Sequence, residues 1–210
     1  MALDTAKKNK QKQRREAQRS GSRETVELIF EATARILAAH GRAGLNTNRI
    51  AEVAGVSIGS LYGYFPNKQA ILLAMARREL DHLRDRVKVA LAPAPGDSPI
   101  DPARRAIRAL IKGYTARGRV RRILMETLFS MGGHEEMARP VSEVAELLRG
   151  RAGDLLPAEA PSPSEMRLYV LTRAVDNTIR TASYENIDFL HSTAFEDELV
   201  RLVRVYFLEP

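Results

Sequence analysis

The sequence predicts an all-α protein. Apolar residues recur at helical spacing from about residue 22 to the C-terminus, and no segment shows the apolar-polar alternation of a strand between turn signals. Glycine or proline separates most of the periodic segments. We therefore expect an N-terminal three-helix domain of the helix-turn-helix type, followed by a larger helical domain.

The first 21 residues lack apolar periodicity, so we interpret residues 1–21 as a flexible basic arm. Its cations are Lys7, Lys8, Lys10, Lys12, Arg14, Arg15 and Arg19. Ser22 is a candidate N-cap for a first helix, which Gly41 ends. The predicted domains are the arm, a helix-turn-helix domain at 22–68 and a second domain at 69–210.

Further helices follow the first one. Two short helices are expected between 47 and 65, and a longer one from 68 to about 92. Others are expected at about 101–117, 119–131, 135–155, 163–186 and 193–208.

Composition narrows the function. The chain has 210 residues, a formal net charge of +7 and no cysteine, which excludes disulfides and thiolate chemistry. Residues 1–68 hold 12 Lys and Arg against 6 Asp and Glu, and the remainder is nearly neutral. That distribution suits contact with a polyanion, although a basic tail that is merely solvated gives the same count.

Other classes of protein find little support in the sequence. No apolar run approaches the ~20 residues that span a bilayer, and no apolar stretch follows the basic N-terminus, so we expect a cytoplasmic protein without a membrane partner. The four histidines are scattered, and neither a phosphate-binding glycine loop nor a serine nucleophile elbow occurs. We expect no enzyme activity, no metal and no cofactor.

The strongest local pattern lies between Leu45 and Lys68. Asn46 can cap a short helix whose buried side is Ile50, Val53 and Ala54, and Gly55 stands where that helix turns. The second helix has Ser57 as its cap, Leu61 and Phe65 as its buried side, and Pro66 after its end; Asn67 can cap the next helix.

The opposite side of the second helix carries small and hydroxyl-bearing residues: Ile58, Gly59, Ser60, Tyr62, Gly63 and Tyr64. Small residues allow a helix to approach base edges, and hydroxyls can reach phosphates or bases. A plain helical hairpin inside a bundle is the alternative, but a core would place aliphatic residues on this side. The pattern therefore predicts a helix that enters the major groove of double-stranded DNA.

The same run, from Ile50-Ala51 through Ala54-Gly55-Val56-Ser57 to Leu61-Tyr62 and Tyr64-Phe65-Pro66-Asn67-Lys68, resembles the DNA-binding domain of the tetracycline-repressor (TetR) family. The resemblance covers about Arg23 to Leu73. It implies a ligand-responsive transcription regulator, a homodimer on a palindromic operator. It also implies DNA contacts by Asn48, Ser57, Ile58, Gly59, Ser60, Tyr62, Gly63, Tyr64 and Lys68. Gly63 departs from the family, in which a larger side chain is common.

The last two helices suit a homodimer interface, because apolar residues recur on both. The candidates are Leu171, Val175, Ile179, Leu199, Leu202, Val203 and Tyr206. The alternative is that both stripes are buried inside one subunit.

A small-molecule effector, hydrophobic or amphipathic, is expected among the middle helices. Tyr114, Met125, Leu128, Phe129 and Met131 offer a flexible lining, although such a stripe is often only core. Arg173 and Asn177, with Asp176 and Arg180, either orient a polar ligand or form an exposed salt-bridge ladder, which we favour.

The predicted function is thus a repressor that a small molecule releases from its operator. The alternatives are a nonspecific architectural DNA-binding protein, in which the arm supplies the affinity, and an enzyme. Equal affinity for random and promoter DNA would indicate the architectural protein.

Overall fold

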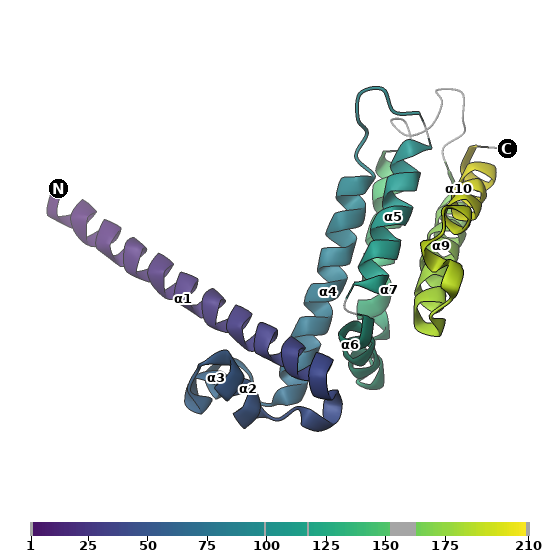
Figure 1. Cartoon of the computed structure of the whole chain (residues 1–210). Coiled ribbons are helices and arrows are strands. Elements are labelled where there is room, and N and C mark those ends of the chain that lie inside the picture. Colours follow the sequence, from purple (N-terminus) through teal and green to yellow (C-terminus); the bar gives the residue numbers. More distant parts are fainter. Residues whose placement is uncertain (1, 99, 117, 152–162, 209–210) are drawn as a thin grey trace. The chain divides into compact units, whose positions relative to one another are not determined.

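The computed structural model describes residues 2–98, 100–116, 118–151 and 163–208, with the backbone alone for 2–20 and 207–208. The described residues are largely helical and contain no strand, which confirms the predicted fold class. The chain divides into two compact units, residues 1–72 and 73–210 (Figure 1).

The first unit contains α1 (Ala2–His40), α2 (Thr47–Ala54), α3 (Ile58–Tyr64) and the start of α4 (Lys68–Ala90). Its core is built by α1, on which Ile29, Phe30, Thr33, Ile36 and Leu37 are buried as the periodicity predicts. Phe30 meets Phe65 with ring centroids 5.7 Å apart. This packing fixes α2 and α3 on one side of α1.

The start of α1 differs from the prediction. The helix continues back to Ala2, so Ser22 lies within it and does not cap its N-terminus. The segment before Ser22 is rich in Ala, Lys, Arg and Gln, residues with high intrinsic helix propensity, so a helix forms there without an apolar stripe. Gly41 ends α1 with φ 62°, as expected. The flexibility of residues 1–21 stays a prediction.

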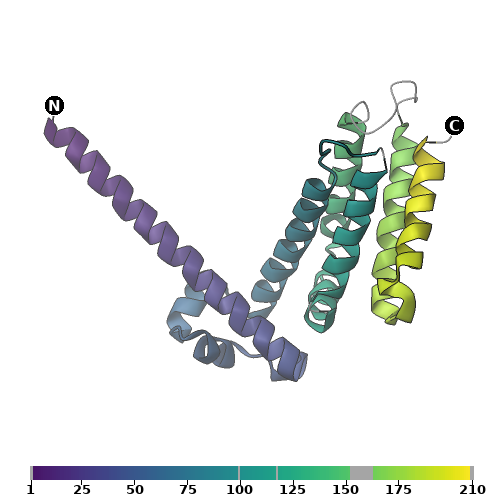
Figure 2. The same ribbon diagram turned by 45° about the horizontal axis from the view of Figure 1, so that its top comes forward.

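The second unit holds the rest of α4 together with α5 (Asp101–Thr115), α6 (Gly118–Ser130), α7 (His134–Gly150), α9 (Glu165–Glu185) and α10 (Thr193–Leu208). Figures 1 and 2 show α4, α5, α7, α9 and α10 running roughly side by side. The predicted helices are confirmed to within a few residues; the predicted end of α7 near 155 lies outside the described residues.

Two apolar clusters hold the second unit together. The larger one joins α4, α5, α9 and α10, and includes Leu83, Ile107, Ile179 and Leu199. The smaller one joins α4 and α5 through Val87, Leu91 and Ala106, with α7 packed against it. Between α4 and α5 the approach is so close at Gly113 that a Cβ atom there would stand 2.3 Å from Leu83 Cδ1.

Candidate functional site

The turn between α2 and α3 is built by single residues at the helix ends. The side chain of Asn46 accepts a hydrogen bond from the Arg49 amide at 2.8 Å, and that of Ser57 accepts one from the Ser60 amide at 3.0 Å. Asn67 accepts from the Ala70 amide at 2.9 Å and so caps α4. Gly55 has φ 67°, the left-handed conformation that a tight turn requires. All of these local predictions are confirmed.

One residue of the predicted buried side of the motif is exposed in the structure. Ile50, Ala51 and Ala54 are buried against the first unit's core, whereas Val53 is 41% exposed, so its predicted burial is wrong. Val53 lies off the side of α2 that holds the other three, and α1 covers only that side. Leu61 is fully buried, and Phe65 is half-buried.

The outer face of α3 is open. Tyr62 is 51% exposed, Tyr64 38% and Ile58 39%. The other residues of this face, and the start of α2, are exposed too: Asn48, Ser57, Gly59, Ser60 and Gly63. The nine predicted DNA contacts therefore include eight exposed residues gathered on one short helix, its cap and the start of α2.

Two contacts fix the position of side chains on this face. The Tyr62 hydroxyl lies 3.1 Å from Thr47 Oγ1, which ties α3 to the beginning of α2. The Lys68 ammonium, half-buried, donates to the Leu45 carbonyl at 3.1 Å. Lys68 thus has a structural role beside the predicted phosphate contact. Thr47 was missed because nothing in its spacing from Tyr62 indicates that α2 and α3 cross there.

A second candidate site is a partly open cavity of about 130 Å³ inside the second unit. Its walls come from α4, α5, α7, α9 and α10 and are mostly aliphatic. The lining includes Leu80, Leu83, Val87, Ile107, Leu110, Met137, Pro140, Val144, Leu171 and Val175. Arg84, Tyr114, Thr172 and Asp176 supply its polar groups. An apolar cavity with few polar groups is the usual form of a small-molecule site.

The predicted ligand residues are divided by the structure. Tyr114 lines the cavity, and Met125 and Phe129 line a separate, partly open pocket of about 320 Å³ that shares Met137 with it. Leu128 is buried in the core, and Met131 is 54% exposed. The sequence does not reveal the lining of this cavity, because aliphatic residues around a cavity repeat at the same spacing as residues of a filled core.

The favoured salt-bridge ladder on α9 does not form. Asp176 accepts a hydrogen bond from the Tyr114 hydroxyl at 2.7 Å. Arg173 instead donates to Ser142 Oγ at 3.1 Å and stacks on the Tyr169 ring. Arg180 donates to the side chain of Asn177. Spacing along one helix does not show which neighbouring helix faces it, and here α5 presents Tyr114 to Asp176.

The structure divides the predicted dimer residues. Leu171, Val175, Ile179 and Leu199 are at most 8% exposed and belong to the subunit's own core. Their burial is the alternative that the sequence left open for these four residues. Val203 and Tyr206 are half-buried, and Leu202 is 37% exposed. The periodicity of α9 and α10 was correct, but it marks the side that packs inward.

Neither a metal centre nor a membrane span is found in the parts of the chain that the structure describes. No group of three or more His, Asp or Glu side chains there is placed to hold a metal ion. None of the helices described combines the length and hydrophobicity that crossing a membrane demands.

A capped pair of short helices, with a hydroxyl-bearing second helix left open, is a helix-turn-helix motif of the kind that binds DNA, and an all-helical unit follows it in the chain. Residues 29–75 match the family model of bacterial regulatory proteins of the tetR family. This stretch of the chain is thus similar to the DNA-binding domain of that family.

Solved structures share this fold. A TetR-family transcriptional regulator from Streptomyces coelicolor is 23% identical with a TM-score of 0.57, covering 87% of this chain and 96% of its own. The fatty acid degradation regulator FadR from Bacillus halodurans is 16% identical with a TM-score of 0.58, covering 85% and 94%. The multidrug binding protein EbrR, complexed with imidazole, is 15% identical with a TM-score of 0.58, covering 88% and 96%. No curated protein is significantly similar in sequence.

Proposed function

We propose that this protein is a regulator of the TetR type, a homodimeric repressor that a small molecule releases from a palindromic operator. The observation that carries the proposal is the exposed face of α3, where Ser57, Ser60, Tyr62 and Tyr64 present hydroxyl groups on a helix whose other side is anchored by Leu61. Exposed hydroxyls on a helix that also carries small residues, here Gly59 and Gly63, can reach both phosphates and base edges.

We assign different tasks to two residues of this face. Tyr62 is held by Thr47, which places its hydroxyl at the edge of the motif and suits it to a phosphate. Ser60 lies one turn into α3, where its side chain is free to turn from Ser57 toward a base. Phosphate contacts add affinity for any sequence, whereas base contacts distinguish sequences.

The test begins with an operator selected from a pool of random DNA by the purified protein. We expect Tyr62→Ala to weaken binding to operator and random DNA alike by about tenfold. Ser60→Ala should instead change the bases selected. Phe189→Ala, at an exposed aromatic residue of the second unit outside the proposed dimer surface, is the matched control. Equal affinity of the parent protein for operator and random DNA would contradict the proposal and indicate an architectural DNA-binding protein.

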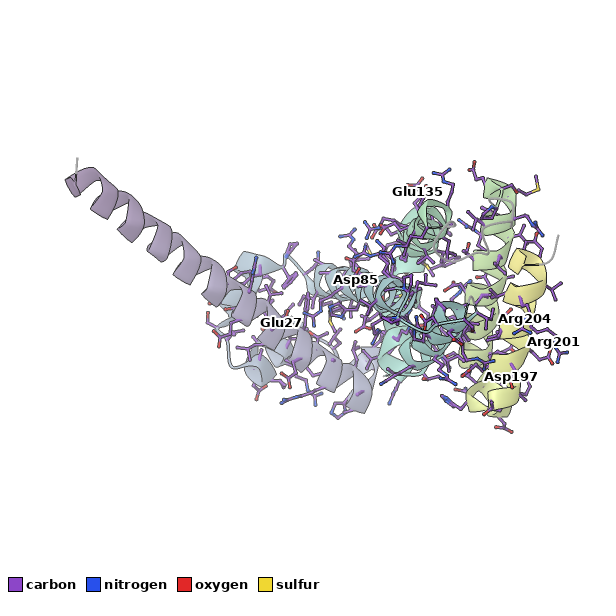
Figure 3. The ribbon with its side chains drawn as sticks, turned by 90° about the horizontal axis from the view of Figure 1, so that it is seen from above. Glu27, Asp85, Glu135, Asp197, Arg201 and Arg204 are labelled. Atoms are coloured by element: carbon purple, nitrogen blue, oxygen red, sulfur yellow. The ribbon has the colours of Figure 1, made fainter. Side chains whose placement is uncertain are left out.

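A dimer is supported by apolar side chains that α9 and α10 leave exposed on their outer sides. Met166, Tyr169 and Val170 are 43–76% exposed on α9, and Leu202 and Val205 are 37% and 49% exposed on α10. Charged residues border them: Asp197, Arg201 and Arg204 project from α10 (Figure 3). An apolar centre with a charged rim is typical of an interface between subunits.

Release is proposed to start at the cavity. A ligand shifts an equilibrium only if it binds one conformation better than the other. The cavity lies against α4, the helix that begins in the DNA-binding unit and continues into the second one without glycine or proline. A ligand that displaces α4 would therefore change how the DNA-binding unit is held, and by linkage DNA would weaken ligand binding by the same factor.

A further inference from the structure

The residues that line the cavity are spread along two neighbouring helices. The lining runs from Leu80 on α4 to Leu91 just after it, and on α7 from Met137 to Leu148. Each stretch covers eleven residue steps, which at 1.5 Å per residue is about 16 Å. The lining along both stretches is aliphatic apart from Arg84, whose guanidinium is paired with Asp81 at 2.7 Å and Asp85 at 2.9 Å. An extended hydrocarbon chain of about ten carbon atoms can lie along this length, partly outside the enclosed 130 Å³, because the cavity is partly open.

One end of the cavity is polar. Tyr114 and Asp176 lie there, joined by the 2.7 Å hydrogen bond between the tyrosine hydroxyl and Asp176 Oδ1. Leu80 and Met137 mark the same end on α4 and α7. The opposite end, near Leu91, Ile100 and Leu148, is aliphatic. A ligand with one polar terminus would therefore bind in one orientation, with that terminus at the Tyr114 end.

Arg121 lies directly behind this polar end. Its guanidinium carbon is 4.5 Å from the centroid of the Tyr114 ring, and the residue is only 3% exposed. Within the described part of the chain, Nε and Nη1 of Arg121 are buried and have no hydrogen-bond partner. The carboxylate of Glu79 is the ion-pair partner, at 4.0 Å from Nη1. Buried donors without an acceptor are costly, so an arriving acceptor would be bound strongly.

The charge around the polar end favours an anion. Arg121, Arg173 and Arg180 all act electrostatically on Asp176, which is the acidic residue of the cavity lining. Burial raises the pKa of Asp176, although its hydrogen bond from Tyr114 and the three arginines oppose that shift. Protonation of Asp176 would leave the arginines with less negative charge to balance. These arginines lie outside the lining and would repel a cationic ligand, whereas the ionised form of Asp176 would attract one.

We propose that the cavity takes an elongated aliphatic carboxylate, with its chain along α4 and α7 and its carboxylate at the Tyr114 end, where Arg121 donates to it. The proposal rests on the ligand-responsive function proposed above and names the class of effector. Arg121 lies against the Tyr114 ring and is not itself in the cavity lining. The Tyr114 side chain therefore has to turn away from Asp176 as the carboxylate enters.

Calorimetric titration of the full-length protein with decanoate, decan-1-ol and decylamine, in the absence of DNA, tests the chemistry of the head group. We expect decanoate to bind tightest and decylamine weakest. In Arg121→Met, decanoate should bind at least about tenfold more weakly while decan-1-ol is unchanged. Arg149→Met, at an exposed arginine of α7, should change neither affinity. Met is a suitable replacement because an apolar side chain of similar length leaves no unsatisfied donor.

Asp176→Asn is the second variant, and it makes the test independent of Arg121. If the carboxylate is the head group, this variant should bind decanoate at least as tightly as the parent. Tightest binding by decylamine that is lost in Asp176→Asn would overturn the proposal, as would unchanged decanoate binding in Arg121→Met. DNA release is measured separately: decanoate binding without release would contradict the proposed function alone, and release by other compounds without decanoate binding would contradict this inference alone.

Discussion

At the scale of single residues, the DNA-binding motif is determined by local chemistry. Asn46, Ser57 and Asn67 each accept a backbone N–H that the first turn of a helix leaves without a partner. These contacts span three residues of sequence, so the residue type and its place before an apolar run are enough to predict them. Val53 could not be placed in this way, because its exposure depends on where α1 stops covering α2.

The left-handed backbone conformation at Gly55 can be tested by substitution. At φ 67° a side chain is strained, and we expect Gly55→Ala to lower the free energy of unfolding by about 1 kcal/mol. Urea unfolding of the full-length protein, followed by circular dichroism, measures the change. Gly63→Ala is the control: Gly63 lies inside α3 with open space around it, so alanine there should stabilise by a similar amount. Equal effects of the two variants would contradict the turn geometry.

At the scale of elements, α4 and α7 are joined by a row of ion pairs. Arg77 pairs with Glu136 at 2.6 Å, Arg139 with Asp81 at 3.1 Å, and Lys88 with Glu143 at 3.0 Å. The hydrogen bond from Arg77 lowers the pKa of Glu136, and that from Lys88 lowers the pKa of Glu143. The helices could be predicted from periodicity, but these pairs could not, because partners some 55 to 59 positions apart leave no local signal.

The lowered pKa values give a pH dependence of known sign. A carboxyl group with a lowered pKa stabilises the folded state above its ordinary pKa, and this contribution is lost as the pH falls through the folded value. We expect the free energy of unfolding to fall between about pH 5 and pH 3, and to fall less in a Glu136→Gln, Glu143→Gln double variant. Glu146→Gln, an exposed glutamate of α7 that pairs within its own helix, is the control. A double variant with the parent's pH profile would show that these pairs add nothing.

At the scale of the whole molecule, the sequence predicts helices and their apolar sides but not which side faces a second subunit. Leu171 and Ile179 repeat at the spacing expected of an interface and instead fill the subunit's own core. The apolar residues that remain exposed for a proposed partner subunit, such as Met166 and Val205, stand among polar residues and show no regular spacing in the sequence. The cavity was hidden for the same reason, because a void is a property of packed helices and not of one helix.

The proposed dimer surface can be tested by placing charges on α10. We expect Leu202→Glu with Val205→Glu to shift the protein toward the monomer, since two charges would be buried at the interface of each subunit. Analytical ultracentrifugation over a range of concentrations measures the shift. Val89→Glu, at a 75% exposed residue of α4, should leave the assembly unchanged. An unaltered dimer in the double variant would place the interface elsewhere.

The close approach of α5 to α4 at Gly113 affects the cavity through Leu83, which contacts Gly113 and lines the cavity. A methyl group at this position would press on Leu83, one of the cavity's own walls, and the nearest atom is the mobile end of that side chain. The absence of a Cβ atom at residue 113 therefore leaves more room in the cavity for a ligand. We expect related proteins that differ from this one at residue 113 to accept thinner or bulkier ligands in a cavity that is otherwise unchanged.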